Sequence, residues 1–352
     1  MISASPGEAW VARADGGLLI DLRLVRDGVT AGDVVEGRVI GRNPELGAAF
    51  IDIGLDRAAI LNDGDRLEPL HEGQWIRVRV LKAARGGKGA GVSQRGVDAG
   101  RPAEAALARA VAFLRGEEDE EIVVDEVAEV PSLKRFGPVT LYRGALPVFE
   151  HYGLQEAIEG ALQPVVPLAG GGSLIIEINA AATMIDVDSG EGGGALAVNL
   201  RAAHEVMRQI RLRNLAGPMV IDFVGLKARA EREQVLAALH EKRGGDVEIL
   251  GWTRLGHMEL RRKRIEAPLT ELFYETILGG GQVKRAATVA FEVLRDLARG
   301  AGKGRVRVSP LIAASLEAGE AAVARRQLEG MLGKRLEIQV DPGLARERYE
   351  VL

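Results

Sequence analysis

The alternation of apolar and polar positions predicts short strands in the first third of the chain. Residues 10–13 and 18–24 alternate on either side of the turn Asp15-Gly16-Gly17, which is a strong signal for a β-hairpin. From Asp33 onward, short alternating stretches are separated by glycines and an Asn-Pro turn. Several short strands with such turns are typical of a small closed β-barrel, which we place at residues 33–96.

Residues 171–225 show a different pattern, in which two apolar strands flank a long helix. Residues 183–185 lead into Asp186, and residues 219–221 lead into Asp222. Between them, apolar residues recur at helical spacing from residue 195 to residue 213, which predicts a helix with one face in the core. Carboxylates at the carboxyl ends of buried strands are common in α/β active sites, although aspartate is also frequent there as an ordinary turn residue.

Two aspartates side by side would repel each other unless a cation lay between them. At about 4 Å and an effective dielectric constant of about 20, the repulsion amounts to about 4 kcal/mol. Mg²⁺ removes this penalty, because it prefers one or two carboxylates together with water and phosphate oxygens. We therefore predict that Asp186 and Asp222 hold a catalytic Mg²⁺, and the turn interpretation is the alternative.

Two clusters of basic residues accompany the aspartates. The first forms a stripe beside the apolar face of the predicted helix and consists of Arg201, His204, Arg208 and Arg211. The second lies at residues 254–264 and includes Arg254, Arg261 and Lys263. Positive charge beside a metal pair suits a phosphodiester backbone, so we expect both clusters to contact nucleic acid. The alternative is that each cluster belongs to the solvated surface of a helix.

Composition narrows the classes of function. The chain has 352 residues, enough for two or three domains, and its 47% hydrophobic and 27% charged residues are ordinary for a soluble globular protein. It contains no cysteine, which excludes disulfides and cysteine-bound zinc. It shows neither a signal peptide nor an apolar run long enough to span a membrane. The net charge of −4 implies that any nucleic-acid surface is a local basic patch.

Several ordered motifs resemble the catalytic domain of the ribonuclease E/G family. They are Gly171-Gly-Ser-Leu-Ile-Ile-Glu, Ile185-Asp-Val-Asp-Ser-Gly, Asn199-Leu-Arg-Ala-Ala-His-Glu, Arg208-Gln-Ile-Arg-Leu-Arg-Asn-Leu-Ala-Gly and Val220-Ile-Asp-Phe. The resemblance implies an endoribonuclease for single strands in which Asp186 and Asp222 hold the metal. It also marks Asn199 as a motif residue that would orient the metal or the phosphate. The alternative for Asn199 is a polar helix residue without a special role.

The predicted barrel carries a second part of the resemblance. Residues 47–54 and 72–74 read Gly-Ala-Ala-Phe-Ile-Asp-Ile-Gly and Glu-Gly-Gln, and they resemble the OB-fold RNA-binding module of the family. Such barrels stack bases on aromatic side chains and place basic groups along the phosphates. Phe50 is the matching stacking residue, and the basic loop consists of Lys82, Arg85 and Lys88. Alternatively, Phe50 is a core residue and the loop is merely solvated. Ile60 occupies the second aromatic position of the family's barrel.

The chain departs from the family pattern at several places. Asp188 replaces an asparagine, where it either joins the metal or caps the turn, and Gly225 replaces a further acid. Residues 189–194 form a shorter loop than the family has. Family members also place a domain that senses a 5′-monophosphate after the barrel, but only a short segment is available for it here. Residues 278–282 read Leu-Gly-Gly-Gly-Gln where most relatives carry the paired cysteines of a zinc link.

These features predict an α/β (α+β multidomain) architecture. A ribonuclease H-like part is interrupted by an OB-fold barrel and is followed by a mixed α/β catalytic domain and a small C-terminal α/β domain. We assign residues 1–32 to the first strands of the ribonuclease H-like part, 33–96 to the barrel, 97–170 to the connecting and remaining ribonuclease H-like part, 171–270 to the catalytic domain and 271–352 to the small domain.

The expected function is that of a Mg²⁺-dependent endoribonuclease, able to use Mn²⁺ and without zinc. It would hydrolyse single-stranded RNA to 5′-phosphate and 3′-hydroxyl products, regardless of the state of the 5′ end. We expect it to act in RNA processing or decay in the cytoplasm, and a homodimer, if it forms, would lack the zinc link. The alternative is an RNA-binding protein of the same family that has lost cleavage. A DNA-processing nuclease finds no support in the barrel.

Overall fold

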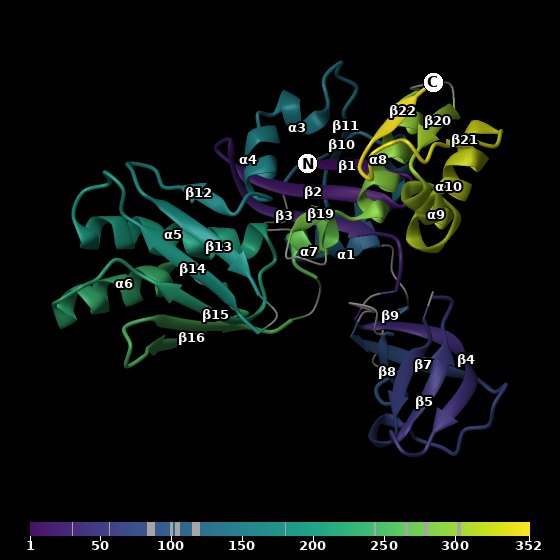
Figure 1. Ribbon diagram of the computed structural model, residues 1–352, viewed down its shortest axis with the longest axis horizontal. Coiled ribbons are helices and arrows are strands. Elements are labelled where there is room, and N and C mark those ends of the chain that lie inside the picture. Colours follow the sequence, from purple (N-terminus) through teal and green to yellow (C-terminus); the bar gives the residue numbers. More distant parts are fainter. Residues whose placement is uncertain are drawn as a thin grey trace.

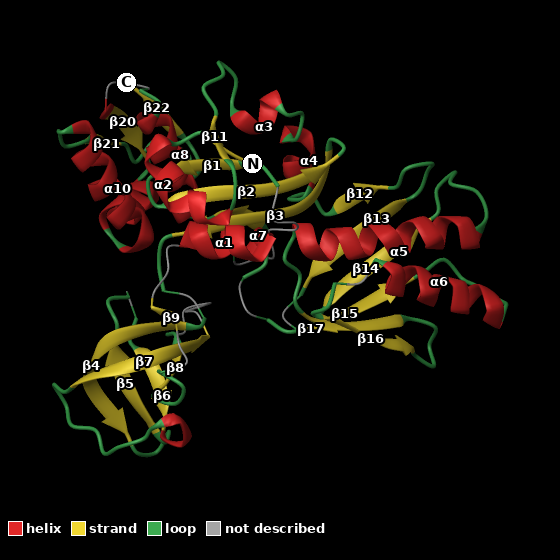
Figure 2. Ribbon diagram, turned by 180° about the vertical axis from the view of Figure 1, so that it is seen from behind, coloured by secondary structure: helices red, strands yellow, loops and turns green. Residues whose placement is uncertain are grey.

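The chain, seen in a computed structural model, folds into four parts (Figure 1, Figure 2). An N-terminal sheet lies at the centre, with a second sheet on one side of it, a small helical domain on the other and the barrel projecting below. In the part of the chain that is described, no helix is long and apolar enough to cross a membrane. The structure describes residues 1–352 except for 30, 56, 83–88, 99–100, 103–105, 115–119, 180, 243, 265–266, 278–280 and 301–303.

The N-terminal sheet has the strand order β11-β10-β1-β2-β3. The first three strands of the chain pair antiparallel, and the predicted hairpin at residues 15–17 is present between β2 and β3. The strands β10 and β11 come after the barrel in the sequence and add to the sheet in parallel. The strand bounds are β1 (Ile2–Ser5), β2 (Glu8–Asp15), β3 (Leu18–Arg26), β10 (Ile122–Val124) and β11 (Val139–Leu141). The helices around it are α1 (Ala106–Leu114), α2 (Val130–Leu133), α3 (Val148–His151) and α4 (Gln155–Gly160), with short 3₁₀ turns at Val127–Glu129 and Lys134–Phe136.

Five strands close into the predicted barrel. Their order is β5-β6-β8-β7-β4, and β4 returns to pair with β5, which confirms the closed barrel. Inward side chains such as Ile76, Val78 and Val80 of β7 alternate with outward ones, because the interior of a small barrel is filled by side chains. The bounds are β4 (Asp33–Asn43), β5 (Ala48–Asp52), β6 (Ala59–Asn62), β7 (Trp75–Lys82) and β8 (Gly91–Ser93), with β9 (Arg101–Pro102) at the edge and a 3₁₀ turn at Asp63–Asp65.

The second sheet, which we call the β12–β17 sheet, has the order β12-β13-β14-β15-β17-β16. The strands β14 and β15 are parallel neighbours joined by the long helix α5, and the other pairs are antiparallel. Helices α5 and α6 cover one face, where Ile185, Ile221 and Leu260 are buried among helix side chains. The bounds are β12 (Val165–Pro167), β13 (Ser173–Ile178), β14 (Thr183–Asp188), α5 (Ala195–Leu212), β15 (Gly217–Asp222), α6 (Arg229–Glu241), β16 (Val247–Trp252) and β17 (Met258–Arg262). This sheet begins before residue 171, where we had placed the boundary of the catalytic domain.

The C-terminal part packs three helices on a small sheet of order β21-β20-β22. The apolar spacing from residue 311 to residue 331 predicts one helix, but the structure has two, because the chain is extended at Ala318 (φ −128°, ψ 156°). The bounds are α7 (Leu269–Phe273), β18 (Tyr274–Thr276), β19 (Gln282–Lys284), α8 (Ala286–Ala298), β20 (Arg305–Val308), α9 (Pro310–Glu317), α10 (Gly319–Leu332), β21 (Glu337–Val340) and β22 (Tyr349–Val351).

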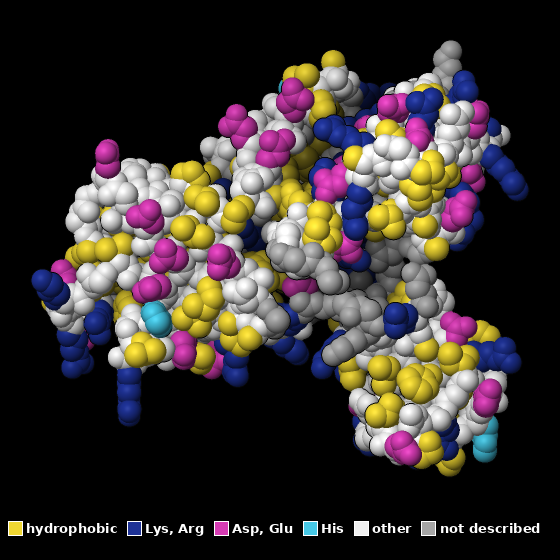
Figure 3. Space-filling model, in the orientation of Figure 1, with side chains coloured by type: hydrophobic (Ala, Val, Ile, Leu, Met, Phe, Trp, Pro, Cys, Tyr) yellow, Lys and Arg dark blue, Asp and Glu magenta, His cyan; other side chains and the backbone are white. Residues whose placement is uncertain are grey.

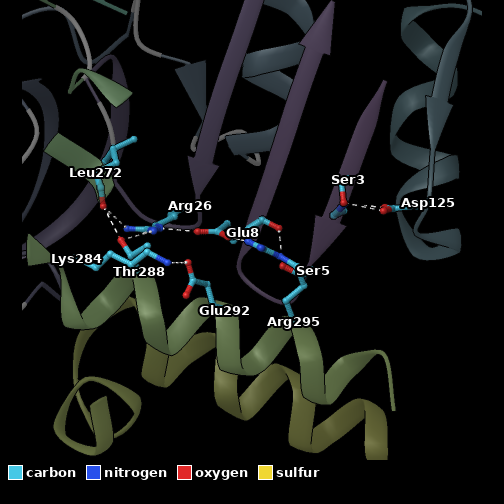
Figure 4. A network of polar contacts seen from close by, with 11 residues as sticks. Ser3, Ser5, Glu8, Arg26, Asp125, Leu272, Lys284, Thr288, Glu292 and Arg295 are labelled. Atoms are coloured by element: carbon cyan, nitrogen blue, oxygen red, sulfur yellow. Dashed lines mark hydrogen bonds and ion pairs between the residues drawn. The ribbon is translucent and has the colours of Figure 1, made fainter. Parts of the chain in front are cut away.

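A buried ion network fastens this small domain to the N-terminal sheet (Figure 4). Glu8 of β2 pairs with Arg26 of β3 at 2.8 Å and with Arg295 of α8, and its side chain is 2% exposed. Gly7 has a φ of 71°, and a Cβ placed on it would lie 2.5 Å from the Cβ of Ala324 in α10. Only glycine allows both this backbone conformation and this approach, so the turn before β2 is part of the domain contact.

Candidate active site

The two aspartates that end β14 and β15 stand at the same level of the β12–β17 sheet. The strands are parallel, and Asp186 is the register partner of Asp222. Buried and exposed side chains alternate along both strands, and both aspartates are exposed on the face opposite to α5 and α6. Neighbouring strands lie about 4.8 Å apart, so two side chains in register on one face can reach a common ion. The structure therefore brings the predicted pair together.

The donor set at this pair fits a hard cation that keeps most of its water. Within the described residues, no group of three or more His, Cys, Asp or Glu side chains is placed to hold a metal ion. Two carboxylates are what Mg²⁺ commonly takes from a protein, with water and phosphate oxygens completing its shell. A structural zinc ion, by contrast, needs four protein ligands. The pair therefore suits Mg²⁺ and does not suit zinc.

Asp188 lies on the same face, one pleat beyond Asp186. Its register partner on β13 is Ser173, and its Oδ1 accepts a hydrogen bond of 3.0 Å from the backbone N–H of Gly190. This bond closes the turn at the start of the short loop that leads into α5, as an aspartate commonly does in such turns. Asp188 thus caps the turn in this structure, and its part in the metal shell stays a prediction.

His257 is a residue of this site that the sequence patterns did not single out. Its Nε2 lies 3.8 Å from Oδ2 of Asp222, so the ring is a neighbour of that carboxylate. The ring comes from the turn between β16 and β17, which is closed by two hydrogen bonds between residues 253 and 257. The contact depends on the antiparallel pairing of β15 with β17, which puts Ile221 opposite Met258. No spacing in the sequence reports such a pairing.

Asn199 lies in the first turns of α5 and is fully buried. Its Nδ2 donates to the backbone oxygen of Val224 at 2.7 Å, and its Oδ1 accepts from the N–H of Val224 at 3.0 Å. Val224 follows Asp222 by two residues, so this amide fixes the segment that leaves β15. The structure gives Asn199 a positioning part, and a direct contact with metal or phosphate stays a prediction.

Arg201 joins the two glycine-rich turns at the carboxyl end of β14. One terminal nitrogen of its guanidinium donates to the backbone oxygens of Gly170, Gly171 and Gly192, at 3.3, 3.2 and 2.7 Å. The first two belong to the turn between β12 and β13, and the third belongs to the loop before α5. Arg201 therefore holds this end of the sheet in shape.

The other arginines of the predicted stripe also have partners within the chain. Arg208 donates to the backbone oxygen of Leu19 at 2.9 Å and to Glu205 at 2.6 Å. Arg211 lies 3.7 Å from a carboxylate oxygen of Asp21. The contacts with Leu19 and Asp21 tie α5 to β3 of the N-terminal sheet, and α5 covers the face of the β12–β17 sheet opposite to the aspartates. Contact of Arg208 and Arg211 with RNA stays a prediction.

The second basic cluster does not lie on a helix. It lies in the turn between β16 and β17 and along β17. Arg261 points to the same face as Asp222, since it stands opposite Pro218 of β15, and it pairs with Glu248 at 2.6 Å. Arg254 and Lys263 are exposed. Their contact with RNA stays a prediction as well.

The predicted RNA-binding residues of the barrel lie partly within the described residues. Phe50 of β5 points outward and is half-buried, and its register partner on β6 is Ile60. Lys82 is exposed at the end of β7. Arg85 and Lys88 lie outside the described residues. Phe50 is not a member of the barrel's core, so the interpretation of this side chain as core is not supported.

Comparison with known proteins finds that the chain is similar to ribonucleases E and G. The model of the ribonuclease E/G family matches residues 104–265, which include both aspartates. Ribonuclease G of Salmonella typhimurium is 28% identical and ribonuclease G of Escherichia coli K12 is 26% identical, each over 100% of this chain and 99% of the relative. Ribonuclease E of Haemophilus influenzae is 34% identical over 172 residues, which cover 45% of this chain and 18% of that protein.

The full-length relatives are longer than this chain. The match to the Salmonella protein runs over 486 aligned residues, whereas this chain has 352. The relative therefore carries segments that have no counterpart here.

Proposed function

The chain belongs to the ribonuclease E/G family, and on that premise we propose that it is a Mg²⁺-dependent endoribonuclease for single-stranded RNA. One observation carries the proposal: Asp186 and Asp222 are register partners on adjacent parallel strands, exposed on one face. Such a pair is electrostatically unfavourable by itself and favourable around a divalent cation.

The residues around the pair have separable parts in this proposal. Asp186 and Asp222 hold the ion, and His257 restricts the orientation of the Asp222 carboxylate. Asn199 fixes the segment after Asp222. When bound, Mg²⁺ supplies charge neutralisation at the scissile phosphate and lowers the pKa of a coordinated water. Hydrolysis then leaves a 5′-phosphate and a 3′-hydroxyl, and Mn²⁺ can replace Mg²⁺.

Single-stranded RNA is the proposed substrate because of the barrel. Its outward Phe50 offers a face for an unpaired base, and the exposed Lys82 offers a charge for phosphate. Bases must be unstacked to be read in this way, which excludes a regular duplex.

We propose that cleavage ignores the state of the 5′ end. Full-length relatives align over more residues than this chain possesses, which supports the loss of the segment that senses a 5′-monophosphate. Two versions of one RNA test this point, since 5′-hydroxyl and 5′-monophosphate forms should be cut at equal rates. A large preference for the monophosphate would contradict it.

We also propose that the N-terminal sheet is a ribonuclease H-like part interrupted by the barrel. Its order, β11-β10-β1-β2-β3, unites strands from both sides of the barrel and supports this assignment. A homodimer of this chain would form without a zinc link, because the chain has no cysteine.

The second candidate function is RNA binding without cleavage. It is favoured by the presence of glycine at position 225, where the family pattern has an acid, and by the lack of a third metal-ligating side chain among the described residues.

One assay separates the two candidates. A short unstructured RNA is incubated with the protein in Mg²⁺ or EDTA, and with the variants Asp186→Asn and Asp222→Asn. The matched control is Glu233→Gln on α6, which removes one exposed carboxylate from the covered side of the sheet. If the protein is an endonuclease, it should cut the RNA in Mg²⁺ and not in EDTA. Each aspartate variant should lose this activity, and Glu233→Gln should keep it. Binding without cutting in all proteins supports the second candidate instead.

A further inference from the structure

The barrel carries an exposed tryptophan that the proposed function has not used. Trp75 begins β7 and is 67% exposed. The other two tryptophans are packed within the protein, Trp10 at 8% exposure and Trp252 against the ring of Phe223. A single exposed apolar side chain is ordinary on a protein surface, so the neighbours of Trp75 decide what it means.

Two arginines stand next to Trp75 on the outer face of β4 and β7. Arg38 of β4 is the register partner of Trp75, and Arg77 lies two residues further along β7, on the same outward face. In the described part of the chain, neither arginine has an ion pair or a hydrogen-bond partner. Directly opposite side chains on neighbouring strands have Cβ atoms about 5 Å apart, so the guanidinium of Arg38 can reach the edge or the face of the ring.

The charge balance of this outward surface is positive although the whole chain is negative. Its acids are Glu36, opposite Arg77, and Asp52, opposite Arg38. Against these two acids stand the outward arginines of β4 and β7, which are Arg38, Arg42, Arg77 and Arg79. The Nε of Arg79 is buried and has no hydrogen-bond partner. A positive strip on a protein of net charge −4 marks a place for a polyanion.

The outer wall of the barrel also carries the proposed stacking residue Phe50, two strands away from Trp75. The neighbouring strands β5, β4 and β7 run side by side in the closed barrel, labelled in Figure 1. Phe50 stands opposite Gly41 of β4, and Trp75 stands opposite Arg38 of the same strand. Two strand spacings and about three residues along a strand separate the two positions by about 14 Å along the wall of the closed barrel, so a strand that touches both must follow the curve of the wall. A few nucleotides of single strand can span this distance, within the usual site of about 4–16 nucleotides for an OB-fold.

We propose that Trp75, with Arg38 and Arg77, forms a second base-stacking subsite for single-stranded RNA on the outer face of β4 and β7. A strand that stacks one base on Phe50 crosses β4 and stacks a later base on Trp75, while the arginines contact the intervening phosphates. Figure 3 shows the surface of the barrel, at the lower right, with hydrophobic side chains among charged ones. This inference rests on the proposed RNA substrate, but not on the cleavage step.

RNA fits this surface better than a protein partner does. Tryptophan and arginine also occur in protein interfaces, so the deciding feature is the charge of this surface: its four outward arginines exceed its two acids, which suits a polyanion. Every base has a face that stacks on an indole, and the guanidinium groups add phosphate contacts and cation–π contacts. Ile60 rather than an aromatic residue stands opposite Phe50 across the strand pair, so Trp75 offers a stacking face that this position lacks.

The test is an RNA-binding measurement in EDTA, where no metal-dependent cleavage takes place. A fluorescent oligouridylate of about 12 nucleotides is titrated with the protein, and anisotropy gives the Kd. Trp75→Ala should weaken binding about tenfold and Trp75→Phe much less, because a phenyl ring still stacks. The double variant Arg38→Ala with Arg77→Ala should reduce the slope of log Kd against log salt concentration by about 1.4, since each phosphate contact with a single strand contributes about 0.7. Leu67→Ala, at a side chain 65% exposed elsewhere on the barrel, is the matched control and should bind as the wild type does.

Tryptophan emission gives an independent readout. Stacking of a base quenches an exposed indole, so RNA should quench the emission of the wild type and leave that of Trp75→Phe nearly unchanged. Equal affinity of Trp75→Ala and wild type, with no quenching, would overturn the inference and leave the proposed nuclease intact. Conversely, the wild type could be quenched by RNA and Trp75→Ala could bind more weakly, while the wild type never cuts RNA. That result would support the inference and overturn the nuclease proposal.

Discussion

The side chain of Asn199 holds both backbone polar groups of Val224, at 2.7 and 3.0 Å. Because Val224 follows Asp222 by two residues, the start of α5 and the end of β15 form one unit. The carboxyl ends of β14 and β15 are thereby kept in a fixed relation, since α5 is also the connection between these two strands. Asn199 thus positions the segment that leaves Asp222.

Replacing Asn199 with alanine should therefore affect both stability and cleavage. The change removes the side-chain partners of the N–H and the oxygen of the half-buried Val224, which should lower the free energy of unfolding by about 1–3 kcal/mol. Cleavage should fall at least about tenfold at temperatures where the variant is still folded, since Asp222 loses its support. Urea denaturation and initial cleavage rates measure the two effects. A folded variant that cuts at the wild-type rate would show that Val224 is positioned by other contacts.

Substitution of Arg201 tests whether this side chain shapes the site or binds RNA directly. Its hydrogen bonds to Gly170, Gly171 and Gly192 predict that Arg201→Ala loosens the two turns and lowers kcat. The salt dependence of RNA binding should stay the same, because these contacts involve no phosphate. Arg201→Lys is the matched control, since a lysine keeps the charge but cannot reproduce the guanidinium geometry. A salt slope reduced by about one in the alanine variant would instead indicate a direct phosphate contact.

The ion network at Glu8 predicts a large loss of stability from one substitution (Figure 4). Glu8→Ala leaves Arg26, whose side chain is 5% exposed, without its carboxylate partner in the interior. Removing one partner of a buried pair costs about 3–5 kcal/mol, and Glu8→Gln should cost less because it keeps the acceptor oxygen. Urea denaturation of these two variants checks the order. As a control, Glu233→Gln breaks an exposed pair and should cost at most about 0.5 kcal/mol.

Asp125 predicts a specific pH dependence of stability. Burial raises the pKa of this carboxyl, although the hydrogen bonds from Ala4 and Ser3 lower it in part. As the pH rises, Asp125 therefore loses its proton at a lower pH in the unfolded chain than in the folded chain. The contribution of the group to folding is complete below its unfolded pKa of about 3.9, and it is lost as the pH rises through the folded pKa.

The variant Asp125→Asn has no ionisable group at this position, so comparing it with the wild type isolates the effect of Asp125 ionisation on stability. The free energy of unfolding of the wild type, minus that of the variant, should decline as the pH rises from about 3.9 and become constant above the folded pKa. Urea denaturation at a series of pH values gives this difference. A difference that grows with pH would mean that the hydrogen bonds outweigh burial.

Local patterns in the sequence were sufficient for many elements of the fold. The hairpin at residues 15–17, the barrel and the two strands that end on Asp186 and Asp222 follow from alternation and turn residues, which report on a few neighbouring residues. The break between α9 and α10 was not predicted, because the apolar spacing continues across Ala318. The strand β17 was also not predicted, because its basic residues hide the alternation.

The contacts of the site were harder to predict than its strands. His257 reaches Asp222 only because β17 pairs with β15, and Glu8 meets Arg295 only because the small domain docks on the N-terminal sheet. Such partners are far apart in the sequence, so no periodicity connects them. The arginines of α5 could be recognised as a stripe, but their carbonyl and carboxylate partners lie on other elements.

In the proposed active site, Asp186 and Asp222 share one divalent cation. Calorimetric titration of Mn²⁺ into the wild type, Asp186→Asn, Asp222→Asn and the double variant, together with RNA cleavage by each, tests it most directly. We expect one ion per chain in the wild type, its loss in either single variant, no cleavage in either, and no further change in the double variant. Wild-type Mn²⁺ binding in both single variants, or cleavage that survives either substitution, would contradict it.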